Sequence, residues 1–144
     1  MRRSLVFAAA LLSFQAYAGE YRSVGEGGAV LYDAPSLQAT PLYVVTKDYP
    51  LELVVQLEHW VKVRDHTGTL SWIEKQRLGE QHTVVVTASS AEAHLRPEEG
   101  APVAFVAAQD VVLELVEQAS GGWLRVRHAD GVDGYLRASL VWGD

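Results

Sequence analysis

The residues of this chain that could take part in catalysis are scattered and do not form the groupings that catalysis needs. The sequence has no cysteine, which excludes a thiol nucleophile. No serine lies in a Gly-x-Ser-x-Gly pattern, and Ser120 precedes Gly121 and Gly122, an order typical of a flexible turn. We therefore expect that the chain is not an enzyme, and hydrolase chemistry is kept only as a remaining alternative.

Metal binding is also poorly supported by residue spacing. The histidines never adopt a tight ligand spacing, and Glu58-His59 lacks the second histidine of a metalloprotease helix. Residues 130–134, Asp-Gly-Val-Asp-Gly, look like the start of a calcium loop but lack its later ligands and terminal glutamate, so a hairpin turn is expected. We predict no metal and no cofactor.

One arrangement that occurs twice does suggest a binding surface. If Val61 and Val63 point into a core, strand alternation places Trp60, Lys62 and Arg64 together on the other face. An aromatic ring beside two cations can stack on a sugar or prolyl ring and pair with carboxylates. The alternative is that the stems of the two cations only cover the Trp60 ring, which then closes the end of a barrel. The second occurrence consists of Trp123, Arg125 and Arg127.

Two further aromatic residues complete the candidate binding residues. Trp72 and Tyr135 each precede an expected core residue, Ile73 or Leu136, so one aromatic of each pair can be exposed. Trp142 is expected to seal the second barrel or the contact between the two units.

These candidates lie in an internal repeat. Residues 60–64, Trp-Val-Lys-Val-Arg, align with residues 123–127, Trp-Leu-Arg-Val-Arg, and the same spacing of 63 carries Gly68 onto Gly131. Upstream the spacing is 62, since residues 51–54 align with residues 113–116. The extra residue falls in the turn over residues 118–122, where glycines make an insertion easy.

Each unit has the alternation of a β-structure. Leu51, Leu53 and Val55 are expected on one face of a strand, and Leu113 and Leu115 on the equivalent face of the second unit. Turn residues separate these runs at 47–48, 66–68, 109–110, 120–122 and 129–131. The pattern predicts an all-β protein without a long helix.

A unit of about 60 residues with about five short strands avoids open edges by closing into a small barrel. We predict two tandem barrels over residues 19–78 and 82–144. The connecting residues 79–81 span only about 10 Å when extended, so the barrels are expected to pack together.

The first 18 residues have the layout of a cleaved signal peptide. Arg2 and Arg3 precede an apolar run over residues 5–12, and Ala16-Tyr17-Ala18 gives a cleavage site after Ala18. The run is too short to span a membrane, and without cysteine there is no lipid attachment site, so no stable membrane anchor is expected. The net charge of −6 argues against nucleic acid as a partner. We predict a periplasmic protein, with secretion as the alternative.

The sequence resembles a tandem pair of bacterial SH3 domains from exported envelope proteins. The resemblance rests on Trp-x-x-Val-Arg at residues 60–64 and 123–127, on a glycine turn before Trp72-Ile73 and Tyr135-Leu136, and on the closing residues 138–141. The first copy departs from the family pattern at Leu70-Ser71, where a glycine is more usual. Residues 29–33 also resemble a stretch of eukaryotic SH3 domains whose tyrosine lines a peptide groove, but the second copy lacks it, and we expect Tyr32 to be a partly buried wall residue.

The resemblance implies SH3-like barrels and non-catalytic recognition. Domains of this family often target cell-wall enzymes to peptidoglycan or bind peptides and proteins of the envelope. The expected function is that of a periplasmic adaptor that recognises peptidoglycan or a wall-associated protein through the Trp60 and Trp123 faces. The alternative is an accessory protein-interaction subunit of an envelope enzyme or complex that does not bind the cell wall.

Overall fold

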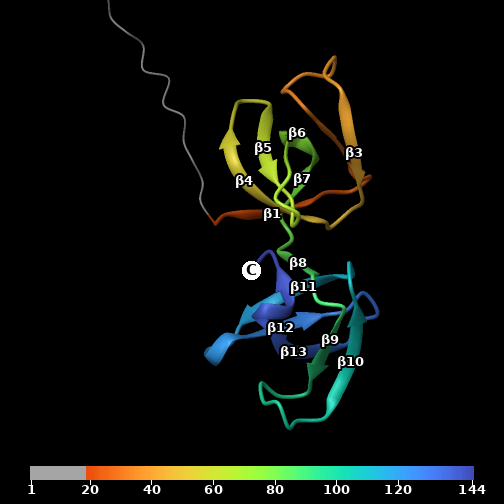
Figure 1. The fold of residues 1–144 in the computed structure, drawn as a ribbon, viewed down its shortest axis with the longest axis vertical. Coiled ribbons are helices and arrows are strands. Elements are labelled where there is room, and N and C mark those ends of the chain that lie inside the picture. Colours follow the sequence, from red (N-terminus) through yellow and green to blue (C-terminus); the bar gives the residue numbers. More distant parts are fainter. Residues whose placement is uncertain (1–18) are drawn as a thin grey trace, which may run out of the picture.

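The computed structural model describes residues 19–144, which form two β-domains in series (Figure 1). The predicted signal peptide, residues 1–18, lies outside the described residues. No helix within residues 19–144 has the length and apolar character needed to cross a membrane. The first domain consists of β1 (Tyr21–Val24), β2 (Ala29–Tyr32), β3 (Pro41–Val45), β4 (Pro50–Gln56), β5 (Trp60–Arg64), β6 (Leu70–Glu74), the one-turn 3₁₀ helix η1 (Lys75–Arg77) and β7 (Leu78–Gly79).

The second domain repeats this order of elements. It consists of β8 (Thr83–Val86), β9 (Ser90–His94), β10 (Val103–Ala108), β11 (Val112–Gln118), η2 (Ser120–Gly122), β12 (Trp123–Arg127), β13 (Asp133–Arg137), η3 (Ala138–Leu140) and β14 (Val141–Trp142). The strand order is β3-β2-β6-β5-β4-β1-β7 in the first sheet and β10-β9-β13-β12-β11-β8-β14 in the second, and every pair is antiparallel. The predicted all-β class and tandem arrangement are confirmed.

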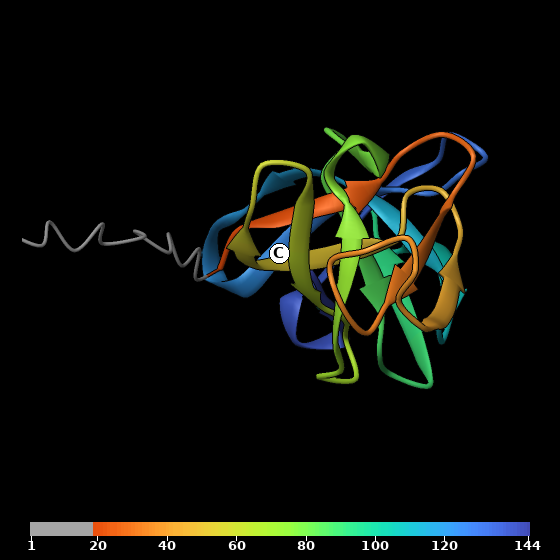
Figure 2. The ribbon, with the colours of Figure 1, turned by 90° about the horizontal axis from the view of Figure 1, so that it is seen from above.

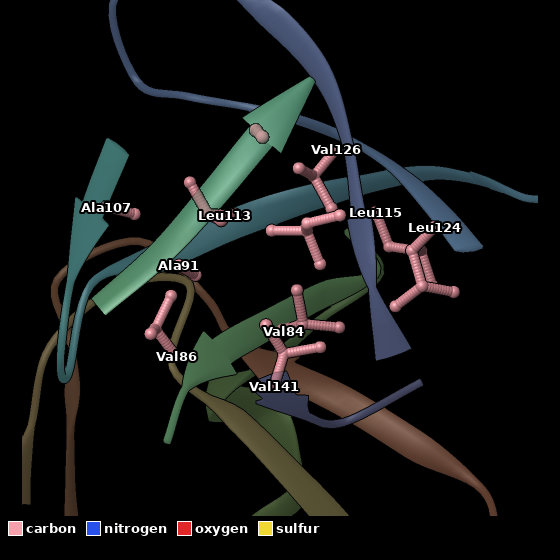
Figure 3. Packing of buried hydrophobic residues seen from close by; sticks show 11 residues of the cluster. Val84, Val86, Ala91, Ala107, Leu113, Leu115, Leu124, Val126 and Val141 are labelled. Carbon is pink, nitrogen blue, oxygen red and sulfur yellow. The ribbon is translucent and has the colours of Figure 1, made fainter. Parts of the chain in front are cut away.

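Each curled sheet encloses its own apolar core. Alternate residues of β5 and β12 point inward as predicted, since Val61, Val63, Leu124 and Val126 are all buried. Full burial of a valine or leucine side chain stabilises a fold by about 1.5–3 kcal/mol. Figure 3 shows the core of the second domain, where side chains from the strands on all sides converge; it is formed by Val84, Val86, Ala91, Ala93, Ala107, Leu113, Leu115, Leu124, Val126, Leu136 and Val141.

A β-bulge in β4 corrects one prediction about the inward face. The pairing with β5 shifts between Leu53, opposite Val63, and Val55, opposite Lys62. The extra residue reverses the alternation beyond it, so Val55 does not share the buried face of Leu51 and Leu53 and is only partly buried. The equivalent bulge follows Leu115 in β11, so the irregularity belongs to the repeat.

The glycine that differs between the two copies is explained by packing. A Cβ added at Gly134 would lie 2.7 Å from the Cβ of Ala93 and 3.2 Å from the ring of Phe105, which packs against the second core. The first copy has Ser71 at this position, which is buried, and Tyr43 at the position of Phe105, which is exposed. The first copy therefore has room for the Ser71 side chain, because the Tyr43 ring points outward instead of packing against this position.

The two domains are stacked along the long axis of the molecule, as the views in Figures 1 and 2 show. The Thr83 hydroxyl, which is buried, donates a hydrogen bond of 2.5 Å to the carbonyl oxygen of Asp48. The backbone near the C-terminus returns to this junction, where Gly143 lies against Pro50 of the first domain. The short connection of residues 80–82 thus leaves the domains in contact, as its length predicts.

Candidate functional site

Trp60 begins β5 directly after the turn that contains Glu58 and His59. Its ring is partly buried and meets the ring of Tyr32 edge to face, with 5.6 Å between the ring centroids and an interplanar angle of 83°. Tyr32 ends β2 and pairs in register with Trp72, while Trp60 pairs with Glu74. Three strands therefore hold these aromatic rings at one end of the first barrel, and Tyr32 is partly buried as predicted.

A groove of about 670 Å³ opens beside Trp60. One wall is the loop between β2 and β3, whose Leu37 side chain is 60% exposed. The other walls come from the β4–β5 turn and from the segment where β6 ends and η1 begins. The lining residues are Pro35, Ser36, Leu37, Gln38, Glu58, His59, Trp60, Glu74, Lys75 and Gln76.

The loop that forms the first wall is held by its own hydrogen bonds. The Asp33 N–H donates to the Thr40 carbonyl oxygen at 3.1 Å, and the Thr40 N–H donates to the Asp33 carboxylate at 2.9 Å. Within the loop, the Ser36 hydroxyl donates to the Gln38 side-chain oxygen at 2.9 Å. The loop therefore presents a preformed surface to the groove, and the Ser36 hydroxyl is engaged within the loop itself.

The charged side chains of the groove are of both signs. Glu58 and Glu74 supply carboxylates, and His59 and Lys75 supply potential cations. The Glu74 carboxylate has Arg77 at 3.9 Å, beyond hydrogen-bond length. Among residues 19–144, the charged partner of Glu58 is its exposed neighbour His59, at 3.5 Å. Both carboxylates are therefore able to accept hydrogen bonds from a ligand.

The structure does not bring Trp60, Lys62 and Arg64 together as one binding platform. Lys62 lies over the ring of Trp72, with its ammonium nitrogen 6.0 Å from the ring centroid. Arg64 donates a hydrogen bond of 2.9 Å to the Glu52 carboxylate. The strand alternation places all three on the outer face, as predicted, but only Trp60 lines the groove.

The equivalent tryptophan of the second domain is covered. Trp123 lies on the predicted face but is only 5% exposed, because the guanidinium of Arg137 stacks over its ring with 4.3 Å from Cζ to the centroid. Arg137 is fixed by bonds of 3.0 Å to the Glu99 carboxylate and to the Gly121 carbonyl oxygen. His94 meets the Trp123 ring edge to face at 5.8 Å. The expectation that Trp123 offers an exposed ring is therefore corrected.

The two cations beside Trp123 are also partnered within the domain. Arg125 and Arg127 both donate to the Asp133 carboxylate, at 2.9 Å and 2.6 Å respectively. Hydrogen bonds from Arg127 lower the pKa of Asp133 below its usual range, and Arg125 acts in the same direction. The Asp133 carboxylate in turn raises the pKa of Arg127. Tyr135 is partly buried and pairs in register with Arg125 and His94.

Sequence reasoning missed the residues that distinguish the surroundings of Trp60 from those of Trp123. Arg137 aligns with Glu74 at the repeat spacing of 63, and Glu99 aligns with Leu37 at 62. These two substitutions between the copies were visible in the sequence, and they are the signal that could have identified the covered ring.

No group of three His, Asp or Glu side chains within residues 19–144 is arranged to hold a metal ion. The sequence model of the family described as Bacterial SH3 domain matches residues 25–80 and again residues 89–143. None of the curated proteins matches the chain.

Three solved structures are similar to the chain at low identity. NlpC2 from Trichomonas vaginalis is 18% identical with a TM-score of 0.39, covering 86% of this chain and 48% of that one. NlpC1 from the same organism is 15% identical with a TM-score of 0.39, covering 95% and 48%. An NlpC/P60 family protein from Bacillus cereus is 15% identical with a TM-score of 0.39, covering 85% and 56%. The chain thus spans about half the length of these proteins.

Proposed function

Because the chain belongs to the bacterial SH3 domain family, with one copy over residues 25–80 and a second over residues 89–143, we propose that it is a non-catalytic binding protein of the cell envelope. It is exported to the periplasm and acts as an adaptor that recognises peptidoglycan or a wall-associated protein. The observation that carries the proposal is the open groove beside Trp60 in the first domain.

The groove has the composition of a recognition site. It joins an aromatic ring and an exposed Leu37 side chain to polar groups of both signs, so it can bury an apolar part of a ligand and hydrogen-bond its polar part. The Ser36 hydroxyl bonds to Gln38 and not to a base, and this supports binding as the role of the groove.

A specific observation favours the second candidate, an accessory protein-interaction subunit. The strand β3 is one of the two edge strands of the first sheet and carries exposed Leu42, Tyr43 and Val44, the last being 79% exposed. An edge strand offers unpaired backbone groups to a partner, and exposed apolar residues add to such a contact. The strand β10 occupies the same edge in the second domain and exposes Val103 and Val106.

Co-sedimentation with purified cell-wall sacculi, together with cross-linking in cells, tests both candidates. Trp60→Ala alters the groove, and Val44→Lys alters the edge strand while leaving the groove intact. We expect Trp60→Ala to abolish binding to sacculi or to a wall-associated partner, and Val44→Lys to leave it unchanged. Loss of partner capture in Val44→Lys with full capture in Trp60→Ala would favour the accessory subunit. Binding unaffected by either variant would contradict both candidates.

The location is tested separately by cell fractionation. We expect the protein in the periplasmic extract, with Gly19 as its first residue by mass spectrometry. A cytoplasmic protein that retains Arg2 and Arg3 would contradict the proposal.

A further inference from the structure

Trp60 and Trp123 occupy equivalent positions, but the residue that pairs with each tryptophan has opposite charge in the two domains. In the second domain the ring of Trp123 carries an arginine side chain of the protein itself, Arg137, held by Glu99. In the first domain the equivalent positions are Glu74 and Leu37, and within residues 19–144 no arginine or lysine lies over the Trp60 ring.

The equivalence rests on pairing and geometry as well as on sequence spacing. Trp60 pairs with Glu74 as Trp123 pairs with Arg137. The edge-to-face contact of Tyr32 with Trp60 corresponds to that of His94 with Trp123. The loops also agree, since the N–H of Ser36 donates to Ala34 and that of Glu98 donates to Arg96, while Ala39 and Ala101 close the same turn. Leu37 and Glu99 therefore stand at the same place.

The second domain thus supplies, from its own chain, the cation that covers its tryptophan ring. A guanidinium 4.3 Å from an indole centroid is attracted by the negative face of the ring, and the Glu99 carboxylate supplies the opposite charge. This contact leaves Trp123 almost without exposed surface. In the first domain the tryptophan is open, and the carboxylates of Glu74 and Glu58 line the same groove.

We propose that the first groove binds the guanidinium of an arginine side chain from an extended polypeptide, stacked on Trp60 with Glu74 and Glu58 as its carboxylate partners. In the second domain such a ligand cannot stack on Trp123 in the same way, because Arg137 already covers its ring. This inference rests on the proposed function in taking the Trp60 groove as the binding site, and it names the chemical class of the ligand.

Peptide titrations test the charge requirement. The probe is the peptide acetyl-Gly-Gly-Arg-Gly-Gly-amide, and its control contains citrulline, which has nearly the shape of arginine without the charge. The readout is the indole N–H signal of Trp60 by NMR, assigned with Trp60→Phe. We expect the arginine peptide to shift this signal and the citrulline peptide to bind about fivefold or more weakly. Equal binding of the two peptides, or tighter binding of purified wall fragments than of the arginine peptide, would overturn the proposal.

Exchanging the groove residues between the domains gives a second test. The double variant Leu37→Glu with Glu74→Arg gives the first domain the two residues that cover Trp123 in the second. We expect the introduced arginine to cover Trp60 and abolish peptide binding. Glu99→Leu with Arg137→Glu makes the reverse exchange, and we expect a new peptide-dependent shift at Trp123. Peptide binding that survives the first exchange would overturn the proposal.

Single variants keep the test usable if an exchanged domain fails to fold. Glu74→Gln removes one carboxylate from the groove, and Glu80→Gln removes the same charge from the exposed connection between the domains. We expect weaker binding of the arginine peptide only in Glu74→Gln; equal affinity in both variants would contradict the assignment. If Trp60→Ala abolishes sacculus or partner binding while arginine peptides never bind, the ligand assignment fails and the proposed function remains.

Discussion

The rings of Tyr21 and Trp142 meet edge to face across the junction of the two domains, with 5.1 Å between their centroids and an interplanar angle of 87°. Tyr21 begins the first strand of the first domain, and Trp142 ends the last strand of the second. This contact and the Thr83–Asp48 hydrogen bond connect the domains at positions far apart in the sequence.

Trp142→Ala is expected to weaken the junction without unfolding either barrel. An edge-to-face pair contributes about 0.5–1.5 kcal/mol beyond the area that it buries. Small-angle scattering should therefore show a larger radius of gyration, and calorimetry a lower temperature for the first unfolding transition. Trp142→Phe serves as the control because it keeps an aromatic ring. An unchanged scattering profile in Trp142→Ala would mean that other contacts hold the domains.

Trp60→Ala and Trp123→Ala are expected to differ in stability. Trp123 is nearly fully buried, so its replacement leaves a cavity and costs about 3–5 kcal/mol. Trp60 borders an open groove, so Trp60→Ala should cost only about 1–2 kcal/mol and leave a folded protein. Urea unfolding followed by circular dichroism measures both values. Equal losses would show that Trp60 is as much a core residue as Trp123.

Asp133→Asn is expected to change the acid stability of the second domain. The pKa of Asp133 is lowered by hydrogen bonds from Arg127, so its carboxylate stabilises the fold at pH values above the pKa of an unfolded aspartate, near 4. That stabilisation is lost as the pH falls through the lower pKa of the folded state. The Tm of the variant should therefore lie below that of the wild type at pH 7 and approach it towards pH 2.

The control for this measurement is Glu80→Gln, which removes an exposed carboxylate outside the ion-pair cluster. We expect its Tm to follow the wild type across the same pH range. A constant difference between Asp133→Asn and the wild type from pH 7 to pH 2 would contradict the assignment.

Tyr49→Phe is expected to change stability in alkali. Burial raises the pKa of Tyr49 to about 12 from an ordinary value of 10.0, and the nearby Asp65 acts in the same direction. The fold favours the neutral phenol, so stability falls as the pH rises from about 10 to about 12. Tyr49→Phe should remove the part of the alkaline loss of stability that is due to this group. The absorbance titration at 295 nm should then lack the phenol that ionises at the highest pH.

The tyrosine experiment has an internal comparison. Tyr43→Phe removes an exposed phenol and should leave both the late titration and the alkaline decline unchanged. Tyr49 also hydrogen-bonds His66, so Tyr49→Phe is expected to be slightly less stable at neutral pH. A late phenol that persists in Tyr49→Phe would assign the raised pKa to another tyrosine.

The architecture was predictable because it depends on short-range patterns that the sequence repeats. Val61 and Val63 alternate with polar residues, and their equivalents Leu124 and Val126 do the same, so each pair defined an inward face. The bulge in β4 was not predictable from this pattern, because an extra residue in a strand changes the facing of Val55 without changing its residue type.

Whether each tryptophan ring is exposed depends on contacts between residues that are distant in the sequence, and the sequence patterns therefore did not predict it. Arg137 reaches Trp123 from the neighbouring strand, and Glu99, which accepts a hydrogen bond from Arg137, lies in a loop 38 residues before it. A lone arginine at the end of a strand gives no local sign that it covers an aromatic ring. Alternation placed Lys62 and Arg64 on the outer face, but it could not indicate that Trp72 and Glu52 already engage them.

In each domain the first strand pairs with the last, β1 with β7 and β8 with β14. Entry and exit of the chain therefore lie at the same edge, and a further copy can follow after a few connecting residues without threading through an existing barrel. Such a module is suited to growth by gene duplication. After duplication, the surface of either copy can change without disturbing the interior of the other, because the two cores are formed by separate sets of residues.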